Sequence, residues 1–329
     1  MKTFANSNAR NLQDATRRSQ EARKAGQHVA YAGGGTDLLQ LVKDRIVSPD
    51  VIVNLKSIPN LNQVTRSASG VSIGGQITLD ALSRNEIIRK DYPVLAEAAA
   101  SIATPQIRNV GTIAGNVAQR PWCWYYRNGF PCYKAGGNQC FSFAGENQFH
   151  AIFGGGPSYI VHPSDTAPAL MALGATFRVV GPSGERNLSA SEFFVLPRQN
   201  AARENVLADE NALASIQLPA PKPGTRSTYH KVLDREAWTH AVVSAAVVLE
   251  MDQQVCRSAS IVLGGVAPIP WRLPQVEAML VGKTITEELA AQAGAAAITG
   301  ARALSKNAYK IPMSRAVVRR TILKVATSV

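Results

Sequence analysis

Two glycine-containing segments constrain what this chain can fold into more than any other part of its sequence. The longer one covers residues 104–116 (TPQIRNVGTIAGN), and the earlier one covers residues 32–38 (AGGGTDL). Because glycine has no Cβ, the main chain of such segments can lie against a ligand, and its exposed N–H groups can surround a phosphate. The side chains of Thr104, Thr112 and Asn116 can reach phosphate or sugar oxygens. Either segment alone is equally typical of a tight turn between a strand and a helix, but the two together favour a ligand site.

The earlier segment does not carry the fingerprint of a dinucleotide-binding fold. Gly33, Gly34 and Gly35 lack the G-x-G-x-x-G spacing, and no acidic residue follows about 20 positions later. A Rossmann fold is therefore disfavoured.

Composition restricts the class of protein. The chain has 329 residues, 46% of them hydrophobic and 18% charged, which is typical of a globular protein with two or three lobes. No apolar run is long enough to span a membrane and the first residues lack a secretory signal, so a cytoplasmic location is expected. The net charge of +12 suits anionic partners such as nucleic acid. However, the basic residues are scattered and no helix-turn-helix pattern is present, which favours a solvated or subunit-facing surface.

The pattern of apolar residues, glycines and prolines predicts short helices and strands in three regions. The expected helices are residues 11–24, 36–42, 79–87, 92–102, 167–173, 274–280, 286–304 and 314–326. The expected strands are residues 28–32, 50–55, 63–65, 71–73, 159–161, 175–180, 184–188, 227–232, 241–249 and 259–263. They divide the chain into a small α/β lobe (1–57), a second lobe (58–220) and a C-terminal α+β domain (221–329), with a Pro-rich linker at residues 219–224.

The two glycine segments resemble those of the FAD-binding (medium) subunits of molybdenum hydroxylases. This family includes xanthine dehydrogenase, carbon monoxide dehydrogenase and hydroxybenzoyl-CoA reductase. The resemblance covers essentially the whole chain and is most marked for the flavin subunits of bacterial, periplasmic-type aldehyde oxidoreductases. It implies an α+β fold with two FAD-binding α/β lobes of the vanillyl-alcohol-oxidase and molybdopterin-dehydrogenase type. A C-terminal domain of the CO dehydrogenase flavoprotein type, with three strands and helices, follows them.

The resemblance also implies a function. A large partner subunit oxidises the substrate at a molybdenum cofactor, a small partner carries [2Fe–2S] clusters, and the flavin subunit passes electrons through FAD to an external acceptor. The chain is thus expected to be the electron-transfer subunit of a heterotrimeric aldehyde oxidoreductase, a trimer that could itself dimerise. It shows no acid–base dyad or nucleophile triad, which suits chemistry carried by a cofactor. A twin-arginine signal on a partner could export the complex to the periplasm.

Other functions remain as alternatives. The chain could be the flavin subunit of a xanthine, carbon monoxide or hydroxybenzoyl-CoA enzyme. A stand-alone flavin oxidase would need its own substrate pocket and catalytic base. A basic nucleic-acid-binding module would carry no flavin and would bind with a steep salt dependence.

By resemblance, a set of residues from the glycine segments, a Ser-Asp pair and a lysine after an aromatic strand is expected to bind FAD. These residues are Ala32, Gly33, Gly34, Gly35, Thr36, Asp37, Leu38, Thr104, Ile107, Arg108, Asn109, Gly111, Thr112, Gly115, Asn116, Ser164, Asp165 and Lys231. Arg108 could instead form a structural ion pair, Asp165 could cap a helix, and Lys231 could be an exposed lysine. A flavin-facing Lys231 would stabilise the reduced, anionic flavin. Residues 235–239 replace an acid pair of xanthine-dehydrogenase-like members, which disfavours NAD as the acceptor.

Three of the four cysteines lie close together, with the spacing C-x8-C-x7-C. They are Cys123, Cys132 and Cys140, within a segment of about residues 119–158. Thiolates in such loops favour an iron–sulfur cluster or zinc. By resemblance, some flavin subunits hold [4Fe–4S] with four cysteines of such an insertion, and this chain has Ser158 at the fourth position. We expect [4Fe–4S], with Ser158, His150 or water as the fourth ligand; a three-iron cluster, zinc or free thiols are the alternatives. Cys256 is expected to be a core or surface thiol.

Overall fold

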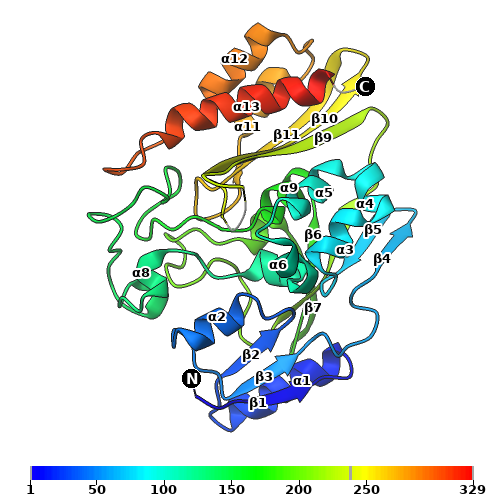
Figure 1. The fold of residues 1–329 in the computed structure, drawn as a ribbon. Helices are drawn as coiled ribbons and strands as arrows, with labels where there is room; N and C mark the ends of the chain where they lie inside the picture. Colours follow the sequence, from blue (N-terminus) through cyan, green and yellow to red (C-terminus); the bar gives the residue numbers. More distant parts are fainter. Residues whose placement is uncertain (1, 237–238, 328–329) are drawn as a thin grey trace.

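The strands form three sheets that follow one another along the molecule in the order of the sequence (Figure 1). The structure is a computed structural model that describes residues 2–236 and 239–327. The expected α+β class, with a separate C-terminal sheet and helices, is confirmed. Within the two described ranges, no helix combines the length and the apolar character that a membrane crossing requires.

The N-terminal sheet is small and parallel. Its order is β1 (Ala5–Asn8), β3 (Val51–Asn54) and β2 (Val29–Ala32), and it packs with α1 (Leu12–Lys24), while α2 (Leu38–Lys43) follows β2. The sequence does not predict β1, because its polar residues show no alternation and it exists only through pairing with β3. Since β2 ends at Ala32, the first residue of the first glycine segment, that segment lies at the carboxyl edge of this sheet.

The second sheet is antiparallel. Its strands, in spatial order, are β4 (Val64–Ser67), β5 (Gly70–Gly74), β8 (Ala212–Pro219), β6 (Thr176–Gly181) and β7 (Gly184–Ser189). The central strand β8 is missing from the sequence prediction, because nearly all of its side chains are buried and an alternating pattern is lacking. It comes from far along the chain and joins the two hairpins, which were both expected, into one sheet.

Short helices cover this sheet and carry the second glycine segment. They are α3 (Leu79–Arg84), α4 (Glu86–Asp91), α5 (Pro93–Ala100), α6 (Pro105–Val110), α7 (Ile113–Ala118), α9 (Thr166–Ala172) and α10 (Ala190–Phe193). The single helix expected at residues 79–87 is wrong, because the side chain of Asn85 accepts hydrogen bonds from the amides of Ile87 and Ile88 and starts a new helix. The strand expected at residues 159–161 is also wrong, since only isolated main-chain bonds hold that stretch.

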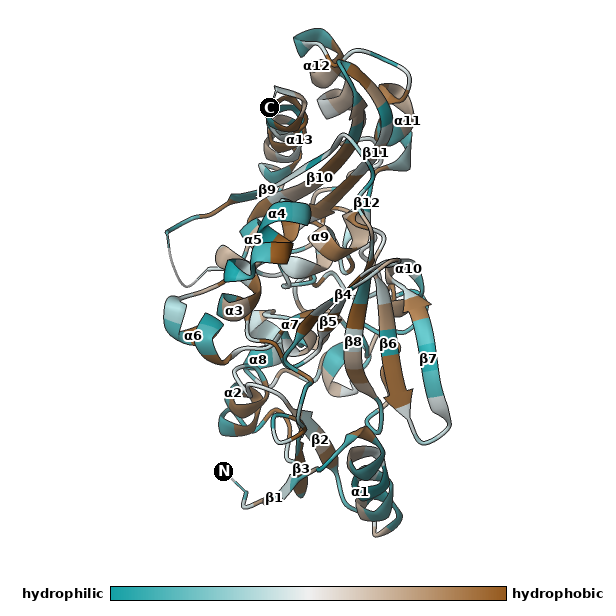
Figure 2. Ribbon diagram, turned by 90° about the vertical axis from the view of Figure 1, so that its right-hand side faces the viewer, coloured by the Kyte–Doolittle hydropathy of each residue, from teal (hydrophilic) through white to brown (hydrophobic). Residues whose placement is uncertain are grey.

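The C-terminal sheet is covered on both faces. Its order is β12 (Trp271–Arg272), β11 (Val255–Gly264), β10 (Val243–Asp252) and β9 (Thr225–Val232). The helices α11 (Pro274–Leu280), α12 (Glu287–Ala296) and α13 (Lys310–Thr327) lie on one side, and α5 and α9 pack from the other. β10 and β11 are therefore apolar along most of their length (Figure 2). The sequence predicts three strands and a helix over residues 286–304; the structure adds the short β12 and ends that helix at Ala296.

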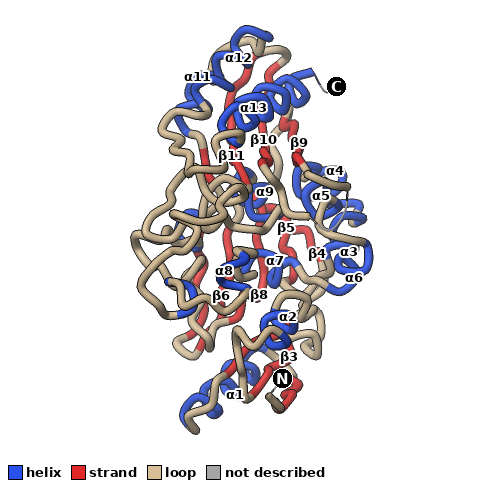
Figure 3. The backbone as a smooth tube through the Cα atoms, turned by 60° about the vertical axis from the view of Figure 1, so that its left-hand side comes forward, coloured by secondary structure: helices blue, strands red, loops and turns tan. Residues whose placement is uncertain are grey.

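The cysteine-rich segment has little regular structure. It contains α8 (Trp124–Arg127) and a short 3-10 helix, η1 (Tyr133–Ala135), joined by long loops on one side of the molecule (Figure 3). Phe153 and Ile152, at its end, belong to the core of the C-terminal domain. The segment thus lies beside the second lobe, and its last residues pack into the core of the third.

Candidate functional site

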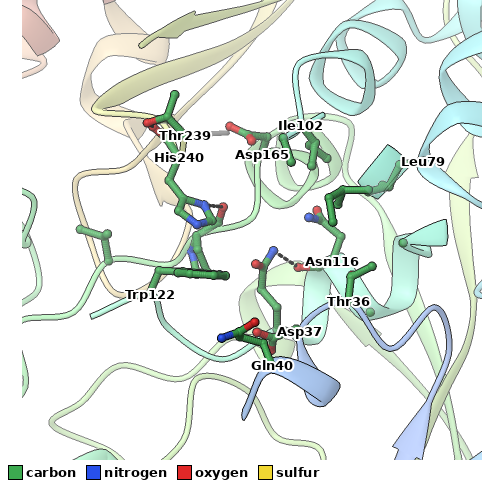
Figure 4. A pocket seen from close by; sticks show the side chains of 18 of the residues that line it. Thr36, Asp37, Gln40, Leu79, Ile102, Asn116, Trp122, Asp165, Thr239 and His240 are labelled. Atoms are coloured by element: carbon green, nitrogen blue, oxygen red, sulfur yellow. Dashed lines mark hydrogen bonds between the residues drawn. The ribbon is translucent and has the colours of Figure 1, made fainter. Parts of the chain in front are cut away.

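A cavity of about 480 Å³ lies where the three lobes and the cysteine-rich segment meet. Trp122 and His240 lie on one side of it, and Asn116 and Ile102 lie on the other (Figure 4). The lining residues are Thr36, Asp37, Gln40, Leu79, Ile102, Ala103, Ile107, Gly111, Thr112, Gly115, Asn116, Gln119, Trp122, Cys123, Trp124, Phe149, His150, Val161, Pro163, Asp165, Asp234, Arg235, Thr239, His240 and Ala241. Because these residues come from every lobe, only the complete fold creates this site.

The two glycine segments pack against each other, main chain to main chain. A Cβ built on Gly34 would lie 2.0 Å from the carbonyl oxygen of Val110, and one on Gly33 would lie 2.6 Å from Oγ1 of Thr112. Side chains at these two positions would push the segments apart. The glycines are therefore needed for the contact between the segments as well as for access to a ligand.

Main-chain amides remain available at this junction. In the described part of the chain, the amides of residues 34–37 donate no hydrogen bond, while Thr36 and Asp37 line the cavity. The hydroxyls expected to reach a ligand have a local role: Thr104 Oγ1 accepts from the Ile107 amide, and Thr112 Oγ1 accepts from the Gly115 amide, so they cap α6 and α7. The open amides, with glycine clearance beside them, suit an anionic group such as a diphosphate.

Asn116 is oriented by two hydroxyl groups behind the cavity wall. Its Oδ1 accepts from Ser164 Oγ at 2.6 Å and from Thr166 Oγ1 at 2.7 Å. Ser164 Oγ also accepts from the Ala167 amide and so caps α9, a role that the sequence suggests for Asp165. The side-chain nitrogen of Asn116, Nδ2, has no partner among the described residues, which leaves it free to donate to a ligand.

Asp165 forms the opposite end of the cavity and is held by a buried network. Tyr229 donates to its Oδ1 at 2.6 Å, and Lys231 Nζ lies 2.8 Å from its Oδ2. Burial, together with the Asp165 charge, raises the pKa of Tyr229 well above its usual value. Lys231 also donates to the carbonyls of Ser101 and Thr239, and its side chain is 3% exposed. Lys231 is expected either to face the flavin or to be an exposed lysine, and both expectations need correction. Its side chain is buried, and Asp165 lies between its ammonium group and the cavity.

The structure brings only part of the expected set to the cavity surface. The expected residues that line it are Thr36, Asp37, Ile107, Gly111, Thr112, Gly115, Asn116 and Asp165. The others are not among the lining residues: Ala32, Gly33, Gly34, Gly35, Leu38, Thr104, Arg108, Asn109, Ser164 and Lys231. Arg108 donates a hydrogen bond to the main-chain carbonyl of Ile102. Its structural role is therefore this contact, in place of the ion pair that the sequence suggests as an alternative.

Sequence reasoning missed the wall that faces the glycine segments. Trp122, Trp124, Phe149 and His150 come from the cysteine-rich segment, and residues 239–241 come from the loop after β9. Aromatic residues next to Cys123 were visible in the sequence, but nothing in it placed them opposite α7. The stretch that disfavours NAD as the acceptor is residues 235–239. Its first residue, Arg235, lines the cavity, as does the preceding Asp234. Residues 237–238 lie outside the described ranges.

A second, much smaller cavity of about 10 Å³ lies beside the first. Cys123, Cys132, Cys140 and Ser158 all line it, and Cys123 lines both cavities. Burial raises the pKa of Cys123 to about 11. None of the four cysteines forms a disulfide, and Cys256 is a buried core residue of β11 whose thiol donates to the Ser258 carbonyl.

His150 lies on the wall between the two cavities. Its Nε2 is 3.3 Å from Cys123 Sγ, and its buried Nδ1 has no partner among the described residues. Burial, with the nearby Lys310 charge, lowers the pKa of His150 to about 4, so the ring is neutral. His150 does not line the small cavity, whereas Ser158 does.

Two sets of polar contacts anchor the cysteine-rich segment. Glu204 pairs with Lys134 at 2.8 Å and with Arg120 at 2.9 Å, and both Lys134 and Glu204 are buried. Asp37, from the first lobe, pairs with Arg127 at 2.7 Å. These ion pairs tie the segment to the first and second lobes.

Comparisons with known proteins agree with this geometry. Residues 2–221 match the FAD binding domain in molybdopterin dehydrogenase, and residues 228–325 match the CO dehydrogenase flavoprotein C-terminal domain. The aldehyde oxidoreductase FAD-binding subunit PaoB of Escherichia coli (strain K12) is 33% identical, over 76% of this chain and 78% of its own length. The carbon monoxide dehydrogenase medium chain of Hydrogenophaga pseudoflava is 29% identical, over 90% of this chain and 89% of its own. A solved carbon monoxide dehydrogenase from H. pseudoflava superposes with a TM-score of 0.77 at 26% identity, covering 99% of this chain and 97% of that chain.

Proposed function

The chain belongs to the family of FAD-binding subunits of molybdopterin dehydrogenases, and on that premise we propose that it is the electron-transfer subunit of a molybdenum-containing aldehyde oxidoreductase. The observation that carries this proposal is the pair of glycine segments packed beside the large cavity, with open amides at residues 34–37. The aldehyde class is supported by the 33% identity to an aldehyde oxidoreductase subunit.

The residues around the cavity suit the parts of FAD. The open amides of residues 34–37 bind the diphosphate, and Asn116 donates to hydroxyl groups. Asp165 accepts from hydroxyls through the lone pairs that Tyr229 and Lys231 leave unused. Ile102 and Trp122 provide apolar walls that exclude water from the rings. When bound, FAD supplies the redox chemistry, and the chain binds and orients it.

The oxidation of the aldehyde is assigned to a large partner with the molybdenum cofactor, and the [2Fe–2S] clusters to a small partner, in a heterotrimer. The cavity walls of this chain do not suit substrate chemistry. The cysteine–histidine contact between Cys123 and His150 is not activated, because burial raises the first pKa to about 11 and lowers the second to about 4. Asp165 is already held by a tyrosine and a lysine, so it is not a free base. This favours a subunit over a stand-alone oxidase.

The experiment that tests the function compares the chain expressed alone with the chain co-expressed with its large and small partners. We expect about one FAD per chain, co-elution of three subunits, and reduction of an artificial acceptor by aldehydes only in the complex. A folded chain without flavin contradicts the proposal. Flavin together with aldehyde oxidation by the isolated chain would establish the stand-alone oxidase instead.

We further propose that the small cavity is the site of a [4Fe–4S] cluster held by Cys123, Cys132 and Cys140. Soft thiolates from one loop segment are the usual ligands of such clusters, and Ser158, which also lines the cavity, would supply an oxygen as the fourth ligand. No group of three or more His, Cys, Asp or Glu residues in the described ranges is arranged around a single ion. A cluster would need more room than this cavity of about 10 Å³ offers, so binding it would require the lining side chains to move outward.

Iron and acid-labile sulfide, counted against FAD after anaerobic purification, test the cluster. We expect about four irons per FAD in the wild type. The S158C variant should hold its iron longer in air, because a fourth thiolate replaces an oxygen ligand, whereas C256S should match the wild type. FAD without iron in both wild type and S158C would contradict the cluster and leave the flavin assignment intact.

A further inference from the structure

We propose that Trp122 is the residue on which a flat ring of the bound cofactor stacks. The inference rests on the proposed FAD function and adds to it one specific contact. It concerns the wall of the large cavity that lies across from Asn116 (Figure 4).

The indole of Trp122 is large, apolar and only partly covered by the chain. It is 41% exposed although it lines the cavity, and Figure 4 shows it on the same side as His240. An apolar surface of this size gains free energy when a second flat ring covers it. A ligand bound in the cavity would supply such a ring.

A buried cation holds the indole in place. Cζ of Arg127 lies 4.5 Å from the centroid of the Trp122 ring, a distance at which a cation is attracted to the face of an aromatic ring. The side chain of Arg127 is 8% exposed, and its Nη1 has no hydrogen-bond partner among the described residues. The attraction to the indole therefore acts where there is little water to weaken it.

The other nitrogens of Arg127 tie it to the loop before α8 and to the first glycine segment. Nε donates to the carbonyl of Pro121 at 2.9 Å, and Nη2 donates to the carbonyl of Arg120 at 3.0 Å. Nη2 also donates to Oδ1 of Asp37 at 2.7 Å. Since Asp37 belongs to the segment whose open amides suit a diphosphate, one side chain links that segment to Trp122. FAD carries both a diphosphate and flat rings, so it can use both surfaces.

His240 borders the indole from the C-terminal domain. The centroids of the two rings are 5.2 Å apart, with an angle of 41° between the ring planes. Nδ1 of His240 donates to the carbonyl of Pro163 at 3.4 Å, and burial lowers the pKa of His240, so its ring is neutral at neutral pH. Trp122 is thus held by groups from α8 and from the loop after β9.

Two other aromatic residues of this wall, Trp124 and Phe149, pack against each other. Their ring centroids are 6.0 Å apart and the rings meet edge to face, at 69°. The C-terminal domain also holds Phe149, because the buried ammonium of Lys310 donates to its carbonyl at 2.8 Å. This packing covers a ring face within the pair, which favours Trp122 as the stacking residue.

FAD has two flat rings, the isoalloxazine and the adenine, and either can stack on an indole. Two measurements distinguish them. An indole stacked on isoalloxazine quenches the fluorescence of that ring, whereas stacking on adenine leaves it unchanged. ADP contains the adenine and the diphosphate without the isoalloxazine, so its affinity reports on the adenine alone.

The experiment titrates FAD and ADP into the full chain by calorimetry, after bound flavin has been removed, and records flavin fluorescence at saturation. Four proteins are compared: wild type, Trp122→Leu, Trp122→Phe and Phe143→Leu. Leucine keeps an apolar side chain without a ring, and phenylalanine keeps a smaller ring. Phe143 is the control, because it is an aromatic residue of the same segment that is 59% exposed and lines neither cavity. Thermal unfolding checks that each variant is folded.

We expect Trp122→Leu to bind FAD roughly tenfold more weakly than the wild type, which is the order of magnitude that stacking on an aromatic side chain contributes. Trp122→Phe should recover most of the affinity, and Phe143→Leu should bind FAD as the wild type does. Brighter flavin fluorescence in Trp122→Leu identifies the isoalloxazine as the stacked ring. An equal loss of ADP affinity with unchanged fluorescence identifies the adenine.

Two results overturn the inference: wild-type FAD affinity in folded Trp122→Leu, and weaker FAD binding that shows neither of these signatures. A folded wild type that binds no FAD is a different outcome, because it contradicts the proposed function itself.

Discussion

The two cavities that meet at Cys123 are built in opposite ways. The large one depends on main chain: two glycine segments from different lobes touch beside a space of about 480 Å³, which Thr36 and Asp37 line and which their amides, without a hydrogen bond in the described part of the chain, can serve. The small one depends on side chains: its lining, around about 10 Å³, includes Cys123, Cys132, Cys140 and Ser158 from one irregular segment. The large cavity is held together by the packing of the first two lobes against each other. The small cavity depends on ion pairs that other parts of the chain make with the cysteine-rich segment.

This difference predicts different weaknesses. A main-chain site fails when an added atom separates the two segments, so its sensitive positions are glycines. A side-chain site on a loop fails when the loop loses its anchors, so its sensitive positions include residues that touch no ligand. Variants that damage one cavity and spare the other test whether the two are separable.

The largest effect is expected for Glu204→Gln, which breaks the anchor of the cysteine-rich segment. The change leaves the buried Lys134 and its neighbour Arg120 without their counter-charge, and breaking such a pair costs about 3–5 kcal/mol. Chemical denaturation should show this loss, and iron content should fall further than FAD content. The matched control is Glu250→Gln, which removes an exposed pair with Lys222 and should cost less than about 1 kcal/mol. Equal losses in the two variants would refute the anchoring role.

The next effect is expected for Gly34→Ala, which attacks the main-chain site. Its methyl group would lie 2.0 Å from the Val110 carbonyl oxygen, so the segments have to separate, at a cost of about 3 kcal/mol with loss of FAD. Equilibrium dialysis with FAD and thermal unfolding measure both. Gly26→Ala is the control, because its Cβ meets nothing within 4 Å, although its positive φ still costs about 1 kcal/mol. Normal FAD affinity in Gly34→Ala would show that the two segments can move apart freely.

A moderate, pH-dependent effect is expected from Lys310, which fixes the loop beside Cys123. Burial lowers its pKa from 10.5 to about 7, so between these values the unfolded chain binds more protons than the folded one. Stability should therefore rise with pH across this window, by at most about 1.4 kcal/mol per pH unit. Lys310→Met should lose this slope while the slope of Lys222→Met stays as in the wild type. Identical pH profiles for Lys310→Met and wild type in urea unfolding would contradict the assignment.

The smallest effect is expected for Tyr229→Phe, which removes one hydrogen bond behind the large cavity. Asp165 loses the donor at 2.6 Å but keeps Lys231, so stability should fall by about 1 kcal/mol and FAD affinity by less than tenfold. Tyr92→Phe is the control, because it loses a comparable bond to the Pro219 carbonyl away from the cavity. If both variants bind FAD as the wild type does, Asp165 does not contribute to the FAD site.

Sequence reasoning succeeded where a short local pattern has a physical meaning. The hairpins of the second sheet and the apolar strands β10 and β11 follow from local patterns and turns. The sequence does not predict β1 and β8, because their pairing partners lie far along the chain and their own residues do not alternate between apolar and polar. In the same way, the sequence predicts that Thr104 and Thr112 reach a ligand, whereas in the structure each hydroxyl accepts from an amide at the start of a short helix.

The sequence by itself determined the chemistry that is available: the glycines that permit a main-chain site, three neighbouring thiols with a serine in the fourth place, and the buried strands of the last sheet. Only the tertiary structure decided which groups face each other. It placed Asp165 between Lys231 and the cavity, and it made Cys123 a shared lining residue of the two cavities, with His150 beside it in the large one. The physical reason is that residue type sets what a group can do, whereas long-range packing sets its neighbours, its burial and its direction.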